Sequence, residues 1–305
     1  MRSTVDKLVK DSITLEYWLP NNKIGIDRSA FSTMRDACFK KDYDDTITKI
    51  IYNNIVEYAI NEYHINYNDI STEQLRALAT SVRYDEEANK TTKRRFGFFG
   101  EVLLYSILYS KFNSNVLISK GYFYSPLEKS ESKGYDAYHI IQRNEKVELW
   151  LGEAKFYINY KKPIHDVISK LKTTMSEGYF KRNVLAIAKE YINISHGKEI
   201  VDKLKPIIET WKQKVSIVIS DELKQHDITL VYPIMIAFQQ KRTIDYHGGI
   251  AECISYIQEL FDSGSFEIDF ELDAKLFFIF LPVDDVTKVK ETVLEWIAIK
   301  APLIL

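Results

Sequence analysis

The sequence predicts an α/β fold in which a mixed β-sheet is flanked by helices. First, strand-like apolar segments alternate along most of the chain with segments of helical periodicity. Second, residues 135–141 and 147–157 are rich in aromatic and β-branched side chains and are separated by a short polar segment, which predicts a β-hairpin. Third, residues 147–157 are largely apolar on both faces, which is typical of a central strand covered on both sides.

Composition limits the function classes. The 305 residues carry a net charge of −2, so a nucleic-acid surface would have to be a local patch. The two cysteines, Cys38 and Cys253, form no zinc-type cluster and are expected to be reduced. The chain begins without a signal-peptide pattern, and no apolar run has the length of a membrane span, so we expect no membrane contact. Abundant Tyr, Ile, Asn and Lys suit an AT-rich bacterial genome, and we expect a bacterial cytoplasmic protein.

The first part of the chain, residues 1–92, is expected to be a mainly helical accessory region, distinct from a domain at 93–305. Residues 12–19 suit a strand, and residues 44–63 have helical periodicity. A further helix is expected from Ser71, as N-cap, to about residue 82. We assign no chemistry to this region.

A basic segment follows, with the sequence KTTKRR at residues 90–95. Lys93, Arg94 and Arg95 are candidates for contact with the phosphates of a nucleic acid. The alternative is a solvated linker, because three acidic residues at 85–87 precede it. The next helix is expected at residues 96–112 and carries Glu101 at the top of an apolar stripe, where an acid also suits the helix dipole.

The hairpin brings charged residues to a strand face that is otherwise apolar. Glu153 and Lys155 continue the face of Val147, Leu149 and Leu151, where a charge is costly unless it is paired or binds a metal. If the turn is centred between residues 144 and 145, Asp136 lies opposite Glu153 on that face. Side chains that lie directly opposite each other have Cβ atoms about 5 Å apart, so the two carboxylates would repel each other without a cation. Mg²⁺ between them would form a site of hard oxygen ligands. A slip of one residue would move Asp136 to the other face.

The remaining chain is expected to continue the α/β pattern. The basic residues Lys161 and Lys162 open a helix that runs to about residue 189 and are further candidates for phosphate contact. Pro233 in the strand at 229–238 predicts an edge or a bulge. His139 lies on the face opposite Asp136 and is expected to be packed or on the surface, not a ligand. The other expected elements are a strand at 115–119, helices at 199–214 and 249–261, a strand at 276–281 and a helix at 285–299.

Three segments together resemble a known family. The sequences FGEVLL at 99–104, KGYD at 133–136 and WLGEAKFY at 150–157 are similar to HamA, the nuclease subunit of the Hachiman anti-phage defence system, with its PD-(D/E)XK nuclease-like core. The resemblance begins near Phe96 and extends to the C-terminus. Tyr135 stands where the pattern name has Pro, a position that varies among these nucleases.

The resemblance implies a metal-dependent DNA endonuclease. Mg²⁺, or Mn²⁺ in its place, would be held by Asp136 and Glu153, with Glu101 and the carbonyl of Ala154 as further ligands. Lys155 would orient the attacking water or help to deprotonate it, and would offset phosphate charge. The implied partner is a helicase subunit of the HamB kind, which would restrain the nuclease and couple it to DNA sensing.

Three other functions remain open at this point. A restriction or repair nuclease could use the same core without a helicase. A non-catalytic adaptor could be built on a nuclease fold, although Asp136, Glu153 and Lys155 argue against it. A ligand-binding or structural α/β protein could carry a coincidental E-x-K strand.

Overall fold

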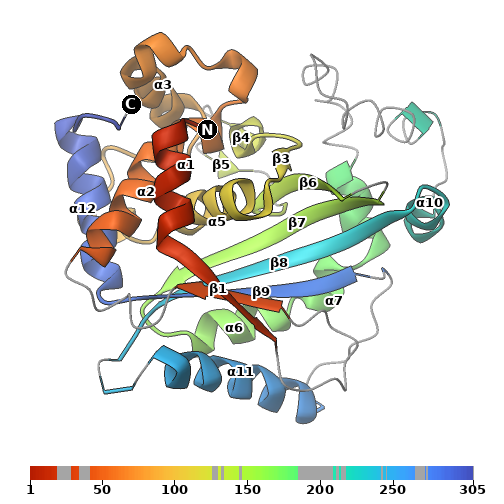
Figure 1. Cartoon of the computed structure of the whole chain (residues 1–305). Coiled ribbons are helices and arrows are strands. Elements are labelled where there is room, and N and C mark those ends of the chain that lie inside the picture. Colours follow the sequence, from red (N-terminus) through yellow and green to blue (C-terminus); the bar gives the residue numbers. More distant parts are fainter. Residues whose placement is uncertain are drawn as a thin grey trace.

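The fold is a seven-stranded mixed sheet with helices on both faces (Figure 1). The computed structural model describes residues 1–18, 29–33, 42–125, 130–131, 134–143, 146–184, 209–210, 213, 218–241, 243–244, 246–264, 272 and 274–304. The strand order is β1-β2-β9-β8-β7-β6-β3. The strands are β1 (Ile13–Trp18), β2 (Ser29–Thr33), β3 (Asn115–Val116), β6 (Ala137–Arg143), β7 (Lys146–Tyr157), β8 (Ile228–Gln239) and β9 (Ala274–Val283). The predicted α/β class and mixed sheet are confirmed.

The helices are α1 (Ser3–Ser12), α2 (Tyr43–Ala59), α3 (Ile70–Thr80), α4 (Lys90–Lys93), α5 (Phe98–Phe112), α6 (Lys161–Ile168), α7 (Leu171–Thr174), α10 (Ile219–Gln225), α11 (Tyr246–Asp262) and α12 (Val286–Ile299). A separate two-stranded sheet pairs β4 (Tyr124–Ser125) with β5 (Ser130–Glu131). None of the helices in these described segments is long and apolar enough to cross a membrane.

The β6–β7 hairpin has the predicted register. Its pairs run from Arg143 opposite Lys146 to Ala137 opposite Gly152. The two turn residues, 144 and 145, lie outside the described residues. One further residue in the same register places Asp136 opposite Glu153, and the Asp136 amide donates to the Gly152 carbonyl at 2.7 Å.

Strand β8 is central, lying between β7 and β9 and parallel to both. The prediction that Pro233 marks an edge or a bulge is therefore wrong, because β8 pairs on both sides and keeps one register with β7 on either side of the proline. The proline is accommodated by Gly152 on the neighbouring strand. A Cβ at Gly152 would lie 2.7 Å from Pro233 Cγ, so the close approach of the two strands requires glycine there.

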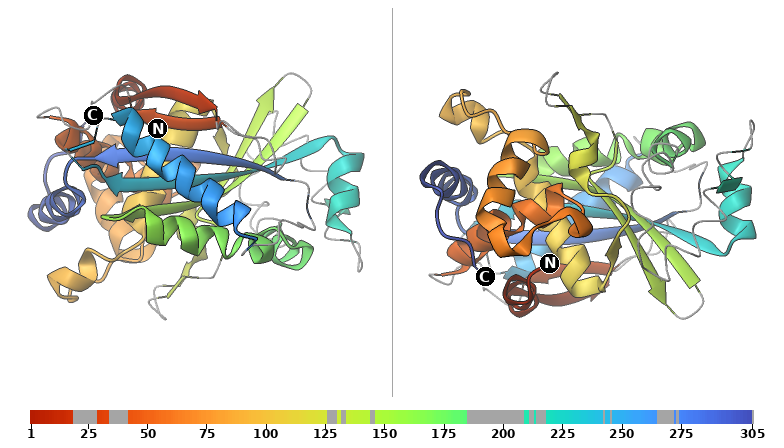
Figure 2. Two further views of the ribbon diagram at one scale, coloured as in Figure 1. Left: turned by 90° about the horizontal axis from the view of Figure 1, so that it is seen from below. Right: turned by 90° about the horizontal axis from the view of Figure 1, so that it is seen from above.

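The two faces of the sheet form two hydrophobic clusters. One cluster joins Trp150, Ala154 and Phe156 of β7 to helices α2, α5 and α12. The other joins Leu149 and Leu151 of β7 to helices α6 and α11. Figure 2 shows α6 and α11 in front of the sheet from below, and α1, α2 and α5 in front of it from above. The prediction that β7 is covered on both faces is confirmed.

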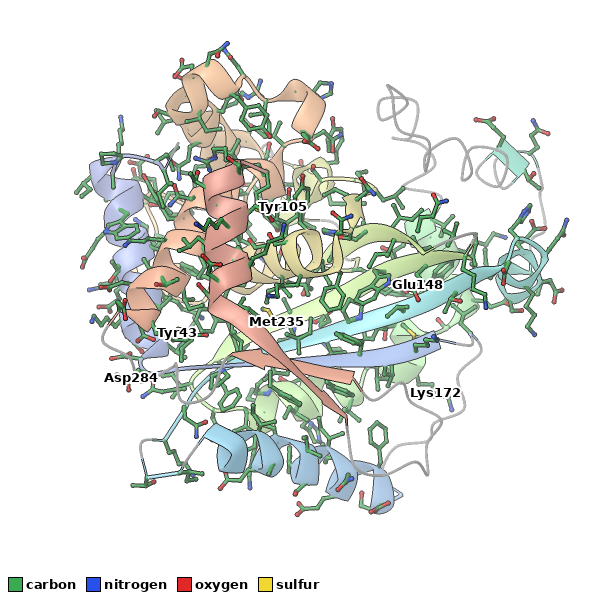
Figure 3. The ribbon with its side chains drawn as sticks, in the orientation of Figure 1. Tyr43, Tyr105, Glu148, Lys172, Met235 and Asp284 are labelled. Carbon is green, nitrogen blue, oxygen red and sulfur yellow. The ribbon has the colours of Figure 1, made fainter. Side chains whose placement is uncertain are left out.

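The N-terminal residues share the core of the rest of the chain. β2 pairs with β9 in parallel, and the same hydrophobic cluster contains Ile47 of α2, Leu104 of α5 and Val293 of α12. Asp44 accepts hydrogen bonds from the amides of Asp284 and Asp285, at 3.1 and 2.8 Å, which joins the start of α2 to the start of α12. Figure 3 labels the neighbouring Tyr43 and Asp284 at this junction. The boundary between residues 92 and 93 stays a prediction.

Several helix predictions need adjustment. The helix expected from residue 161 to 189 is interrupted after Ile168, where α6 ends, and α7 begins at Leu171. Helix α3 is capped by Asp69, which accepts from the Thr72 amide, and not by Ser71. The helix expected at 199–214 falls almost entirely outside the described residues, as does Cys38.

Candidate functional site

A cavity of about 680 Å³ lies at the C-terminal end of β7, where this strand approaches α4, α5 and α12. It contains residues from each of the three motif segments, including Glu101, Asp136 and Lys155. A smaller cavity of about 230 Å³ lies beside Tyr160 and contains none of the predicted catalytic residues. The larger cavity is therefore the candidate site.

Asp136 is held in place by the strand that it faces. Its Oδ2 accepts a hydrogen bond from the Ala154 amide at 2.8 Å, and its Oδ1 lies 4.0 Å from Lys120 Nζ. Lys120 is buried and donates to the Tyr135 carbonyl at 2.5 Å, so its charge is fixed behind the carboxylate. Lys120 could not be identified from the sequence, because it comes from the chain segment between β3 and β4 and belongs to none of the motif segments.

Glu153 and Lys155 form an ion pair on one face of β7, and each side chain is less than a fifth exposed. Burial raises the pKa of Glu153, and the negative charge of Asp136 raises it further, while Lys155 opposes both effects. Burial lowers the pKa of Lys155, but the charges of Asp136 and Glu153 outweigh burial and the net shift is upward. Lys155 is therefore protonated across the physiological range. Its Nζ also lies 3.3 Å from the Ala154 carbonyl, to which it donates.

Glu101 reaches the cavity from the first turn of α5 and is nearly buried. Its carboxylate accepts a hydrogen bond from the Tyr58 hydroxyl of α2, a residue to which sequence reasoning assigned no role. Gly97 lies close to this carboxylate, since a Cβ there would be 2.5 Å from Glu101 Oε1. The acid therefore has a fixed position, although it comes from the opposite face of the sheet to Glu153.

The donor set fits a metal ion with few protein ligands. Within the described residues, no group of three or more His, Cys, Asp and Glu side chains is arranged to hold a metal. Asp136, just before β6, and Glu153 on β7 remain as a pair of neighbouring carboxylates, since the charge of Asp136 raises the pKa of Glu153. Mg²⁺ is commonly held by one or two carboxylates together with water and substrate phosphate. This pair meets that requirement, with the Ala154 carbonyl beside it.

The predicted phosphate contacts divide into two groups. Arg94, Arg95 and Lys162 line the cavity with the motif residues. Lys93 does not: its Nζ donates to the Glu86 carbonyl at 2.5 Å. Lys161 lies instead over the ring of Tyr256, at 5.3 Å from its centroid. The prediction of His139 as a packed residue is confirmed, because it is buried and bonded to Ser114, and burial lowers its pKa to about 3.

Lys290 of α12 is a further cavity residue that the sequence did not indicate. Its Nζ donates to the carbonyls of Phe156 at 2.7 Å and Arg94 at 3.2 Å. It also lies over the ring of Phe99, 5.4 Å from the centroid, and burial lowers its pKa to about 8. In the sequence it reads as one lysine on an ordinary amphipathic helix, far from the motif, so only the folded chain identifies it.

The next residue, Glu291, binds the basic segment from the same helix. Its two carboxylate oxygens contact Lys90 Nζ at 3.0 Å and Arg94 Nη1 at 3.1 Å. Helix α12 thus holds Arg94 through both its side chain and its carbonyl, and fixes the basic segment at the rim of the cavity.

Comparison with known proteins agrees with the motif. No curated protein matches the sequence. The HamA family model matches residues 9–297, which is nearly the whole chain and includes the N-terminal region as well as the cavity residues. The protein therefore belongs to the HamA family and is a Hachiman defence protein.

Proposed function

We propose that the protein is a Mg²⁺-dependent DNA nuclease that acts as an effector in anti-phage defence. The observation that carries this proposal is that Asp136 and Lys155 line a cavity with basic side chains, while Glu153, which does not line it, is ion-paired with Lys155. Burial and the charge of Asp136 both raise the pKa of Glu153, and a divalent cation between the two carboxylates would offset their repulsion.

The residues of the site support separate roles. Bound Mg²⁺ would polarise the scissile phosphate and lower the pKa of a coordinated water. Asp136 is oriented by the Ala154 amide, so one of its oxygens has a fixed direction. Because its pKa is raised, Lys155 carries a proton and suits the role of orienting water and stabilising phosphate charge, not that of a resting general base. Glu101 and the Ala154 carbonyl are the supplementary ligands in this proposal.

Plasmid degradation tests the activity. The purified protein is incubated with plasmid DNA and Mg²⁺, with and without EDTA, beside Glu153→Ala and Lys155→Ala. Lys224→Ala is the matched control, because Lys224 is exposed on α10 at the opposite end of the sheet (Figure 1). We expect Mg²⁺-dependent degradation by the wild type and the control, and none by the two site variants. Circular dichroism establishes that each variant is folded.

A folded wild type that cleaves nothing would leave two explanations, and calorimetry separates them. Heat of Mg²⁺ or Mn²⁺ binding that is lost in Asp136→Asn would indicate a metal site whose activity needs a partner. No cation binding at all would refute the metal-dependent mechanism and favour a non-catalytic adaptor.

The proposed partner is a helicase subunit, as in other Hachiman systems, and this part rests on family membership. Co-purification of the tagged protein with a co-expressed helicase of the HamB kind would support the partnership. Cleavage by the isolated chain without such an association would favour a stand-alone restriction or repair nuclease.

A further inference from the structure

An exposed apolar patch adjoins the site at the end of β7. Tyr157 is 48% exposed and Ile158 is 59% exposed, and both line the cavity. Side chains alternate along a strand, so Tyr157 lies on the same face as Glu153 and Lys155. Large apolar groups exposed beside a polar cavity are typical of interaction surfaces.

The same cavity is rich in positive charge. Its lining contains the five basic side chains of Arg94, Arg95, Lys155, Lys162 and Lys290 and the two carboxylates of Glu101 and Asp136. Three of the basic side chains, those of Arg94, Lys155 and Lys162, also contact carboxylates that do not line the cavity, namely Glu291, Glu153 and Asp166. The chain as a whole carries a net charge of −2, so these cations are a local concentration. A cavity that combines such charge with an exposed aromatic ring suits a ligand that has both phosphates and flat apolar groups.

We propose that Tyr157 is a stacking platform for a base of single-stranded DNA, whose backbone follows the basic side chains of the cavity. This inference rests on the nuclease function proposed above and names its substrate as single-stranded or locally unpaired DNA. Lys290 Nζ lies 5.8 Å from the centroid of the Tyr157 ring, so a phosphate attracted to this lysine brings its base close to the ring.

Geometry favours an unpaired strand over a duplex. Tyr157 follows Lys155 by two residues, which is about 7 Å along a strand. A phosphate at Lys155 therefore places a neighbouring nucleotide near the ring. In a duplex, each base is already stacked on its neighbours, so its face is not open to a side chain, whereas the bases of a single strand can be splayed onto an aromatic ring.

Binding is measured by fluorescence anisotropy in EDTA, with a labelled single-stranded oligonucleotide and with its duplex. The proteins are the wild type, Tyr157→Ala, Tyr157→Phe and, as a matched control, Tyr67→Ala, since Tyr67 is 40% exposed and does not line the cavity. We expect Tyr157→Ala to weaken single-strand binding by roughly 5- to 150-fold, from about 1–3 kcal/mol per stacked base. The other two variants should match the wild type, and the duplex should bind more weakly.

An abasic scan separates stacking from a general loss of affinity. A single abasic position is moved along the oligonucleotide, and one position should weaken wild-type binding but cause no further loss in Tyr157→Ala. Equal losses in both proteins, or wild-type affinity in Tyr157→Ala, would overturn the proposal. It would also be overturned if Tyr157→Ala left oligonucleotide binding intact and abolished helicase association, because the patch would then bind protein. Since no metal is present, these outcomes are independent of whether the chain cleaves DNA.

Discussion

Gly152→Ala tests the close approach of β7 and β8 directly beneath the candidate site. The added Cβ would lie 2.7 Å from Pro233 Cγ, 2.9 Å from the Pro233 carbonyl oxygen and 3.1 Å from Leu104 Cδ2. Carbon atoms in good contact are about 3.5–4.0 Å apart, so the overlap with the proline ring approaches 1 Å. The ring is rigid and β8 is held by a strand on each side, so neither can move aside without cost.

Overpacking of this kind lowers the free energy of unfolding by about 1–3 kcal/mol. Replacing a glycine within a strand by alanine raises it by about 0.5–1 kcal/mol, because the unfolded chain loses conformational freedom. We therefore expect the free energy of unfolding to fall by roughly 1–2 kcal/mol. The matched variant is Gly100→Ala in α5, where the new Cβ would have ordinary contacts of 3.5 Å with Ala154 and Phe156. That change should raise stability by up to about 1 kcal/mol, because a helix interior prefers alanine.

Urea unfolding followed by circular dichroism gives the midpoint and slope for each protein. Adding Pro233→Ala to Gly152→Ala should recover part of the loss, because only the contact with the ring is removed while the carbonyl contact remains. The packing argument is refuted if Gly152→Ala is as stable as the wild type, or if Pro233→Ala recovers none of the loss.

Three further predictions concern charges at the site. Lys155→Met leaves Glu153 buried without its partner, so the free energy of unfolding should fall by about 3–5 kcal/mol. In a thermal-shift assay, Mg²⁺ should restore part of the lost melting temperature of this variant. If Mg²⁺ restores none of it, the result counts against metal binding at this site. The folded pKa of Lys290 is about 8 and its unfolded pKa about 10.5, so the unfolded chain binds more protons between these values and stability should rise with pH across that window, by at most roughly 3 kcal/mol. Urea titrations from pH 7.5 to 9.5 should show this rise in the wild type but not in Lys290→Met. Glu291→Ala should lower the free energy of unfolding by less than about 1 kcal/mol and should tighten oligonucleotide binding, because the side chain of Arg94 is released from its ion pair. Glu295 is exposed on the same helix, so Glu295→Ala should change neither stability nor binding.

The pairing register of the hairpin could be predicted from the sequence, although the first strand begins and ends two residues later than predicted. Alternation determines the face of every side chain, and the charges of Glu153 and Lys155 stand out on a face that is otherwise apolar. The register that brings Asp136 to Glu153 follows from the turn position alone. Predictions from local sequence fail where a contact between distant residues accommodates a residue that is unfavourable in that element. Pro233 predicts an edge or a bulge because proline lacks an amide proton, whereas Gly152 makes room for it in the centre of the sheet.

The rest of the site could not be predicted because it comes from helices that carry no local signal. Tyr58 lies on α2, far from the motif in sequence, and its hydroxyl reaches Glu101 only because α2 packs beside α5. In the sequence, Lys290 cannot be distinguished from the lysines of an exposed helix face. Its role becomes visible only in the folded chain, where α12 packs against the end of β7 and Lys290 donates to the Phe156 carbonyl. The lack of recognisable motifs in residues 1–92 predicts a separate region, but motifs carry no information about whether these residues pack in the same core as the rest of the chain.

The strand order also sets when the site can form during protein synthesis. The two nearest strands on one side of β7, namely β8 and β9, are translated after Glu153, and Lys290 follows them. The N-terminal strand β2 must likewise wait for β9, with Ala30 pairing beside Phe278. A nascent chain on the ribosome thus holds its carboxylates long before it has the sheet and the last helix that shape the cavity around them. We expect the chain to gain the candidate cavity only when its translation is nearly complete.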